Sequence, residues 1–384
     1  MNAIMNHMTY LDYAAATPMD ESVFKAMQPY FTEKFYNPSA TYLAAQGIKK
    51  DLEAARAKVA YWFGARPNEI TFTAGTTEAN NLVINGVMRQ YPEAQIVVSA
   101  IEHESVLAPA HQYDCVETPV TPKGLVDVET LRNNITDNTV LVSIMYANNE
   151  VGTVQPLNHI GLLIEEIRQD RRKRGVELPI YLHSDAAQAA NYLDLHAARL
   201  RVDFMTINGG KIYGPKQSGA LYANSHVRLL PQILGGGQER GLRSGTENVA
   251  GSIGLAQALD LVQNRRHQEV ARLHKLQQLC IAELEKHIPS VVINGSRDKR
   301  LPNNIHVTIP GQDNERLLMS LDESGILCAA GSACSASNEE PSHVLRAMGI
   351  NEKDAQASLR FTMGAQTTES DIRQTIDALA KIVV

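Results

Sequence analysis

The most constraining feature of this chain is a regular alternation of short apolar runs with helix-period patterns, from about residue 48 to 255. Several of the runs are continuously apolar, as expected of strands that are covered on both faces. Strands that alternate with helices favour parallel pairing. We therefore predict an α/β fold with a mainly parallel, doubly covered sheet. The strand-like runs are residues 69–75, 95–103, 139–150, 179–188, 203–209 and 219–223.

The sequence changes character after about residue 259. A long helical pattern is followed by the strand-like run "LPNNIHVTI", by shorter mixed segments and by a final helix. Thr368 and Asp371 have the spacing of a capping box at the start of that last helix. We expect a large domain of residues 15–258, and beside it a smaller α+β domain of residues 1–14 and 259–384.

The charge balance excludes some partners. Formal net charge is -6, from 36 basic and 42 acidic residues, so neither nucleic acid nor an anionic membrane is expected as a direct partner. The densest basic run, residues 168–174, ends a helical pattern, where cations are favourable. No apolar run reaches the ~18 residues of a membrane span, and the N-terminus lacks a signal-peptide pattern. A cytoplasmic location is the expectation.

Four cysteines in 384 residues, none in a CxxC pattern, indicate neither a disulfide framework nor a metal site. Cys334 stands out because it lies in "AGSACSASNEEPS", residues 330–342, among small residues that cannot build a core. From this position alone the thiol is either incidental or dependent on mobility. Cys328 has an apolar strand setting typical of a buried, inert thiol, and Cys115 and Cys280 are interpreted as packing residues.

In open α/β sheets, ligand sites form where strands end. The first strand leads into Gly75, Thr76 and Thr77, a turn whose N–H groups and hydroxyls suit a phosphate or simply cap a helix. His103 follows the next strand, and a lone histidine there is usually structural. Asn149 follows a third strand in a sequence that is also typical of a plain turn.

Two further strand ends carry a more specific signal. Asp185 ends a strongly apolar strand, with Gln188 three residues on, and a buried carboxylate there requires a partner. Lys211 follows two glycines at the end of another strand. A lysine for Schiff-base chemistry and an aspartate for a pyridinium nitrogen are the pair that pyridoxal 5′-phosphate requires. Together with the phosphate candidate at Gly75, they favour that cofactor.

With these residues in place, the chain resembles the cysteine desulfurases of the class V, fold type I aminotransferase superfamily. The resemblance extends from residue 10 to residue 364 and rests on many motifs in one order. They are "YLDYAAATP", "FTAGTTEANNL", "EHESV", "ANNEVGTVQP", "HSDAAQ", "KIYGPK", "GGGQERGLRSGTEN", "GSACSAS" and "EPSHVLRAMG". It implies a fold type I architecture, with a seven-stranded, mainly parallel sheet in the large domain.

The resemblance also implies roles for residues at the strand ends. Lys211 would bind the cofactor covalently, Asp185 would pair with its pyridinium nitrogen, and Gln188 would hydrogen-bond its phenolic oxygen. His103 would stack on the ring and assist proton transfer. The residues implied at the phosphate are Gly75, Thr76, Thr77, Asn208 and, from the other subunit of a homodimer, Thr246.

For the substrate, L-cysteine, the resemblance implies that Asn149 and Arg360 bind its carboxylate, which an arginine fork matches bidentately. Cys334 would be the nucleophile that takes the sulfur as a persulfide and leaves alanine. A carrier thiol must visit both the pocket and an acceptor protein, so a loop of small residues suits it. The expected acceptors are an iron–sulfur scaffold or a tRNA-thiolation enzyme.

One departure from the family pattern concerns the phosphate. Relatives usually have Ser-Gly-His before the lysine, whereas this chain has Asn208, Gly209 and Gly210. Either the Asn208 amide or the backbone N–H groups of the two glycines compensate, or cofactor binding is weaker. The alternatives to a desulfurase are a selenocysteine lyase, another class V aminotransferase, and a non-catalytic sulfur-relay scaffold.

Overall fold

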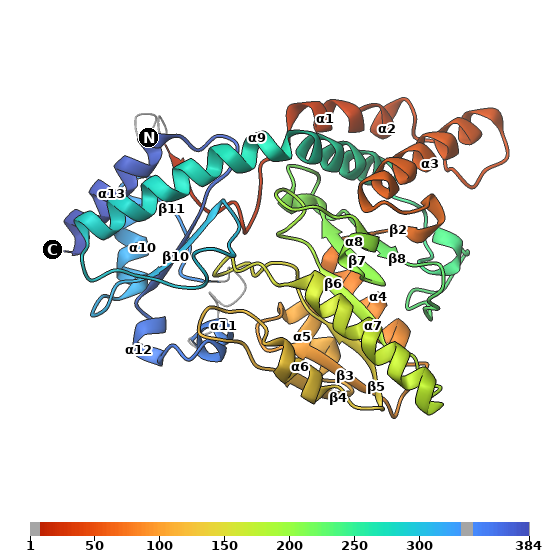
Figure 1. Ribbon diagram of the computed structural model, residues 1–384. Coiled ribbons are helices and arrows are strands. Elements are labelled where there is room, and N and C mark those ends of the chain that lie inside the picture. Colours follow the sequence, from red (N-terminus) through yellow and green to blue (C-terminus); the bar gives the residue numbers. More distant parts are fainter. Residues whose placement is uncertain (1–7, 332–340, 384) are drawn as a thin grey trace.

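The computed structural model describes residues 8–331 and 341–383, and a seven-stranded sheet forms its centre (Figure 1). The strand order is β2-β8-β7-β6-β5-β3-β4. Strand β8 is antiparallel to both of its neighbours, and every other neighbouring pair is parallel. The prediction of a mainly parallel seven-stranded sheet is therefore confirmed. The strands are β2 (Ile70–Thr73), β3 (Gln95–Ser99), β4 (Asp114–Thr118), β5 (Thr139–Ser143), β6 (Tyr181–Asp185), β7 (Phe204–Asn208) and β8 (Gly219–Ala223).

Edge strand β4 is absent from the predicted strands. Its ends, Asp114 and Thr118, enclose only three residues, and Glu117 among them is exposed. Charged side chains are common on edge strands because they discourage pairing with other chains. They also hide the apolar pattern by which strands are found in a sequence.

Helices cover both faces of the sheet. Alternate residues of β3 belong to different apolar clusters, because Val97 packs in one cluster while Ile96 and Val98 pack in another. The basic run at 171–174 forms the last turn of α7, as predicted. The helices of this part are α1 (Glu21–Met27), α2 (Pro29–Thr32), α3 (Leu43–Phe63), α4 (Thr76–Met88), α5 (Glu104–Ala110), α6 (Val128–Asn134), α7 (Leu157–Arg174) and α8 (Ala197–Leu200).

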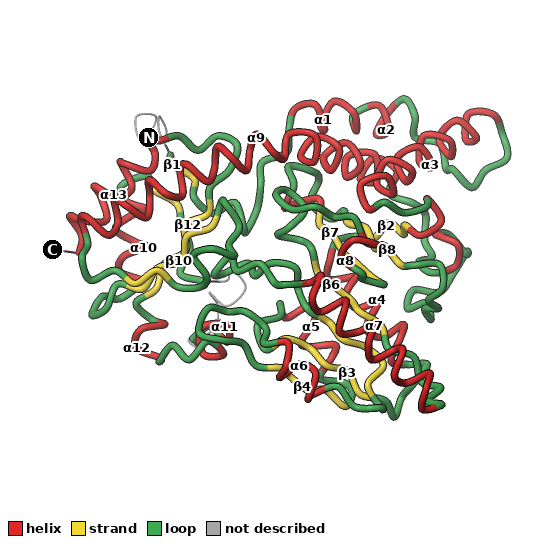
Figure 2. Tube along the Cα trace, in the orientation of Figure 1, coloured by secondary structure: helices red, strands yellow, loops and turns green. Residues whose placement is uncertain are grey.

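A second structural unit is built on an antiparallel sheet, β12-β10-β9, and a parallel pair, β1-β11. Helices α10 and α13 and the C-terminal half of α9 enclose its apolar cluster (Figure 2). The capping box of α13 is confirmed, because the N–H of Thr368 donates to Oδ2 of Asp371 and the N–H of Asp371 donates to Oγ1 of Thr368. The elements are β1 (Thr9–Tyr10), α9 (Val249–His287), β9 (Val292–Ile293), β10 (Asn304–Thr308), α10 (Asn314–Glu323), β11 (Ile326–Leu327), β12 (Ser358–Thr362) and α13 (Glu369–Val383).

Helix α9 is continuous and extends over both units. Its N-terminal part lies beside the helices of the large unit, and its C-terminal part lies along the second unit (Figure 1). The predicted division after residue 258 falls inside this helix and stays a prediction. Two short helices, α11 (His343–Ala347) and α12 (Glu352–Ala355), follow the second unit's β11 in sequence. Val344 and Leu345 of α11 pack in one cluster with Ile101 and Met145 of the large unit. None of the described helices is long and apolar enough to cross a membrane.

Candidate active site

A cavity of about 260 Å³ opens where the carboxyl ends of the parallel strands meet the second unit. A larger cavity of about 690 Å³ adjoins it and shares Thr76, Thr77, Asn208 and Lys211 with it. The position agrees with the rule that ligands bind at the carboxyl ends of strands in open α/β sheets. Nine of the predicted site residues line the first cavity: Thr76, Thr77, His103, Asn149, Asp185, Gln188, Asn208, Lys211 and Arg360.

Asp185, at the end of β6, has only 6% of its surface exposed. Its Oδ2 accepts a hydrogen bond of 2.7 Å from Nδ2 of Asn80, and its Oδ1 accepts one of 2.8 Å from the N–H of Ala187. Within the described residues no cationic side chain forms an ion pair with this carboxylate. A buried charge is costly unless a partner compensates it, so the site is suited to a ligand that presents a positive N–H.

Lys211 lies in a short 3-10 turn, Gly209–Lys211, directly after β7. Its Nζ donates a 2.5 Å hydrogen bond to the carbonyl of Ala15. The loop around Ala15 is fixed in turn, since both the N–H and the hydroxyl of Thr17 donate to the carbonyl of Gly210. The amine is therefore held beside the cavity by a segment from the N-terminal end of the chain.

The phosphate candidate is the N-terminus of α4. Gly75 precedes this helix with φ +139°, a conformation that glycine adopts far more easily than other residues. Within the described residues no side chain caps the first turn of α4, so the N–H groups of that turn suit an anion. Thr76 and Thr77 begin the helix and line both cavities.

Asn208 joins this helix to the lysine turn. Its Oδ1 accepts from the N–H of Gly210 at 2.9 Å, and its Nδ2 donates to Oγ1 of Thr76 at 3.3 Å. The N–H of Gly209 is also engaged, because it donates to the carbonyl of Ser218. Both glycine N–H groups already have acceptors, so they are not available to a phosphate. The geometry therefore favours the Asn208 amide as the replacement for the Ser-Gly-His donors of the family.

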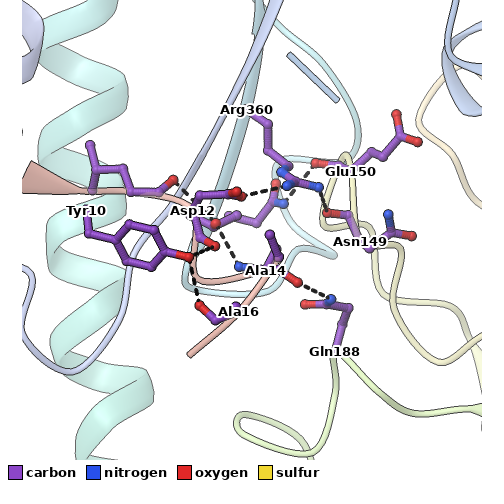
Figure 3. A network of polar contacts seen from close by, with 12 residues as sticks. Tyr10, Asp12, Ala14, Ala16, Asn149, Glu150, Gln188 and Arg360 are labelled. Carbon is purple, nitrogen blue, oxygen red and sulfur yellow. Dashed lines mark hydrogen bonds and ion pairs between the residues drawn. The ribbon is translucent and has the colours of Figure 1, made fainter. Parts of the chain in front are cut away.

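His103 caps helix α5. Its Nδ1 accepts a 3.0 Å hydrogen bond from the N–H of Ser105. Because a backbone N–H can only donate, the proton of the neutral imidazole lies on Nε2. Gln188 donates from Nε2 to the carbonyl of Ala14, which leaves its Oε1 available to the cavity (Figure 3).

Arg360, on β12, brings the second unit to the cavity and is only 2% exposed. One of its terminal nitrogens donates to Oδ1 of Asp12 at 2.7 Å, and the other donates to the carbonyl of Asn149 at 3.1 Å (Figure 3). Its Nε has no partner in the described part of the chain. The guanidinium, which belongs to a residue that lines the cavity, is therefore fixed by both structural units at once.

Two predicted residues are not in this assembly. Thr246 is exposed and lines neither cavity. Cys334 lies outside the described residues. Burial raises the pKa of the Cys115 thiol to about 11 and the pKa of Cys280 to about 12. Cys328 is partly exposed rather than buried, but desolvation still raises its pKa to about 12, so none of these three thiols is readily ionised.

Two contributors were missed because the sequence interpretation followed the ends of the predicted strands, and β1 was not among those strands. Asn80 lies inside α4 and supports Asp185, and Asp12 follows β1 and orients Arg360. A signal for Asn80 exists, since asparagine is a poor helix former and here it stands beside the apolar Ala79, Leu82 and Val83. A polar residue on the buried side of a helix needs a buried partner.

The chain matches the family described as aminotransferase class V over residues 9–375. The chain belongs to this family. Among its relatives, a protein of Dictyoglomus turgidum named cysteine desulfurase IscS is 40% identical over 386 residues, covering 99% of this chain and 95% of that protein. The family match and this relative confirm the resemblance that the sequence motifs indicated.

Solved structures agree with the family. A structure named NifS-like protein superimposes with a TM-score of 0.90 at 30% identity, covering 98% of this chain and 99% of the other. A NifS-like protein from Rickettsia africae gives a TM-score of 0.87 at 32% identity, with coverage of 98% and 99%. The fold type I architecture of class V aminotransferases is thus established for this chain.

The cofactor of this family, pyridoxal 5′-phosphate, fits the residues of the cavity. The amine of Lys211 and the buried carboxylate of Asp185, which has no ion pair among the described residues, line one space. Thr76 and Thr77 at the N-terminus of α4 line it too. These are an aldehyde-binding amine, a partner for a pyridinium N–H and an anion site, which are the three groups that the cofactor needs. The cofactor prediction is confirmed.

Proposed function

We propose that this class V enzyme is a cysteine desulfurase in which Cys334 receives the sulfur of L-cysteine and alanine is released. The activity agrees with its cysteine desulfurase relatives. The observation that carries the residue assignments is the single cavity lined by Lys211, Asp185, His103 and Arg360, which come from different strands and from both structural units.

The cofactor would be held at three points. Lys211 would bind it covalently and Asp185 would pair with its ring nitrogen. Gln188 would donate to its phenolic oxygen through the second N–H of Nε2, since the first donates to the carbonyl of Ala14. When bound, pyridoxal phosphate draws electrons away from the Cα of the attached amino acid. Asn80 keeps the Asp185 carboxylate oriented for this pairing through its 2.7 Å hydrogen bond.

The phosphate would lie at the first turn of α4. The N–H groups of Thr76 and Thr77 and the threonine hydroxyls are the donors there, with Gly75 as the preceding residue. Asn208 acts on this site through Thr76, to which its Nδ2 already donates. Thr246 is assigned to the cofactor of a second copy of the chain, which implies a homodimer, and its exposure is consistent with that role.

The substrate carboxylate would bind Arg360 and Asn149. Arg360 lines the cavity, and its terminal nitrogens are oriented by Asp12 and by the carbonyl of Asn149. His103, whose Nδ1 accepts from the N–H of Ser105, would exchange the proton of its Nε2 with the reacting amino acid. As the C–S bond of cysteine breaks, one S–S bond forms at Cys334. L-Cysteine and a thiol thus become L-alanine and a persulfide, with atoms and electrons balanced.

The product persulfide requires a protein that accepts its sulfur. We propose an iron–sulfur scaffold or a tRNA-thiolation enzyme as that acceptor, and a cytoplasmic location. A selenocysteine lyase would use the same cavity, but nothing in the lining residues favours selenium over sulfur.

The proposed function is tested by reducing the yellow holoprotein with borohydride and locating the cofactor by peptide mapping. We expect it on Lys211 in the wild type and absent in Lys211→Ala. Cys334→Ser should keep the colour and lose persulfide formation. A protein that stays colourless after reconstitution would support the relay scaffold instead, and a Cys334→Ser variant with full activity would support another class V aminotransferase.

A further inference from the structure

The phosphate of the cofactor needs more positive charge than the residues assigned to it so far provide. A phosphate monoester carries about −1.5 to −2 charges at pH 7. The N-terminus of α4 offers the equivalent of about half a positive charge, and Asn208 is neutral. The amine of Lys211 is assigned to the covalent link. A further cation at this end of the site would therefore stabilise the bound phosphate.

The larger cavity, of about 690 Å³, has such a cation in its lining. Two lysines, Lys211 and Lys216, line it together with Thr76 at the start of α4. Lys216 is exposed, and within the described residues its amine forms no ion pair and no hydrogen bond. The carboxylate of Glu78 lines this cavity too, but it is paired with Arg243 at 2.8 Å. The amine of Lys216 is therefore available to an anion in the cavity.

A tight turn before β8 carries Lys216. Oγ of Ser218 donates to the carbonyl of Pro215 at 2.6 Å, which closes the turn with Lys216 and Gln217 at its tip. Gln217 has φ +57°, a left-handed conformation that is uncommon outside glycine. The carbonyl of Ser218 accepts from the N–H of Gly209 at 2.8 Å. The turn is therefore fixed against the residues that precede the cofactor-binding lysine.

Gly210 is the position at which relatives usually have a phosphate-binding histidine. In this chain it has no side chain, and it lines the larger cavity together with Lys216. The groups beside its empty side-chain position are Oδ1 of Asn208 and the stem of Lys216. Oδ1 of Asn208 is an acceptor, which a phosphate does not bind. The lysine is thus the neighbour of this position that has the charge for a phosphate.

We propose that Lys216 binds the phosphate of the cofactor and supplies the positive charge that residues 208–210 of this chain do not provide. This inference rests on the proposed function, because it takes the phosphate to lie at the first turn of α4. An ammonium group attracts phosphate as a point charge and donates up to three hydrogen bonds. Asn208 and Lys216 have separate roles in this account: Asn208 orients Thr76, and Lys216 neutralises the anion.

The test measures the dissociation constants of pyridoxal 5′-phosphate and of pyridoxal, which lacks the phosphate, with cofactor-free wild type, Lys216→Met and Lys216→Arg. Methionine keeps an apolar stem and removes the charge. We expect Lys216→Met to bind pyridoxal phosphate about tenfold more weakly and pyridoxal within about twofold of wild type. Lys216→Arg keeps the charge and should bind both within about threefold. Unchanged affinity for pyridoxal phosphate in Lys216→Met would overturn the proposal. An equal loss for both ligands would also overturn it, because it would show a structural role.

A matched control and a second probe sharpen the comparison. Lys173→Met removes an exposed lysine in the last turn of α7, which lines neither cavity, and should bind both ligands as the wild type does. The double variant Gly210→His with Lys216→Met should regain most of the lost affinity for pyridoxal phosphate, because histidine restores a donor. Inorganic phosphate should raise the Tm of the cofactor-free wild type more than that of Lys216→Met. Equal rises in Tm would count against Lys216 as a phosphate ligand.

Failure of the proposed function is distinguishable from failure of this inference. None of the measurements requires turnover, so they report on Lys216 even if the wild-type protein makes no alanine from cysteine. Thr76→Val tests the underlying position of the phosphate and should also weaken pyridoxal phosphate more than pyridoxal. A loss in Thr76→Val without one in Lys216→Met overturns the role of Lys216 alone. No loss in either variant overturns the position of the phosphate at α4 as well.

Discussion

Asn80 of α4 donates a 2.7 Å hydrogen bond from Nδ2 to Oδ2 of Asp185 at the end of β6. The same amide group contacts Oγ of Ser105, and its Oδ1 accepts from the hydroxyl of Thr206. A residue that is fully buried in a helix thus ties together three elements around the carboxylate assigned to the pyridinium nitrogen. Asn80 therefore supports the site from inside a helix, at a position that does not follow a strand.

Replacing Asn80 should therefore affect both stability and cofactor binding. Asn80→Ala leaves buried groups without partners, and we expect a loss of about 1–3 kcal/mol in the free energy of unfolding of the cofactor-free protein. Asn80→Asp places a second carboxylate against Asp185, and pyridoxal phosphate affinity should fall at least about tenfold. Denaturant unfolding and cofactor titration measure the two effects. Asn85→Asp, on the same helix but away from both cavities, should bind the cofactor as the wild type does.

The absent histidine before Lys211 gives a prediction of improved binding. A Cβ at Gly210 would meet Oδ1 of Asn208 at 3.4 Å and Cγ of Lys216 at 3.5 Å, which are ordinary contacts, and the position lines the larger cavity. Gly210→His should fit and add a donor for the phosphate, strengthening cofactor affinity about tenfold. Gly210→Ala is the steric control and should bind as the wild type does. A comparable loss of affinity in both variants would show that the cavity does not admit a side chain. Gly209 admits none, since a Cβ there would lie 2.1 Å from Oγ of Ser218.

Glu102 makes stability depend on pH. Burial raises the pKa of this carboxyl well above its ordinary value, nearby Asp185 raises it further, and the N–H of Met145 opposes the shift. The folded protein therefore keeps Glu102 protonated at pH values where the unfolded chain has lost that proton. Unfolding then releases a proton, so this group's contribution to stability falls as pH rises from about 4.3 towards the raised pKa, by about 1.4 kcal/mol per pH unit.

Glu102→Gln removes this dependence. We expect the variant to gain thermal stability relative to wild type at pH 8 compared with pH 5, as measured by the difference in Tm of the cofactor-free proteins. Glu104→Gln, whose carboxyl is exposed, should show the same difference from wild type at both pH values. A Glu102→Gln difference that does not change with pH would mean that Glu102 is ionised in the fold.

The features that the sequence predicted correctly are those set by local hydrophobic patterns and by the order of strands along the chain. Asp185 and Lys211 could be brought together because parallel strands end at one edge of a sheet, and the structure places both at one cavity. Asp12 could not be paired with Arg360 in this way, because an isolated bridge and the pairing of β1 with β11, over 300 residues apart, create that contact. A hydrophobic pattern within a short stretch of sequence does not indicate either the bridge or the strand pair. Edge strand β4 was missed because its charged residues break the apolar pattern.

The position of Asn208 shows the same limit. Its role depends on the distance to Thr76, which lies 132 residues earlier in the chain, after β2, while β8 separates β2 from β7 in the sheet. From the sequence, two compensations for the altered motif were equally acceptable. Only the acceptors of the Gly209 and Gly210 N–H groups distinguish them.

Sulfur capture at Cys334 is tested most directly by peptide mass spectrometry after a single turnover of wild-type holoprotein with L-cysteine. We expect one added sulfur atom on the peptide that contains Cys334, in an amount equal to the alanine formed, and neither product in Lys211→Ala. Alanine formed at the wild-type rate by Cys334→Ser, or the added sulfur found on Cys115, Cys280 or Cys328 instead, would contradict it.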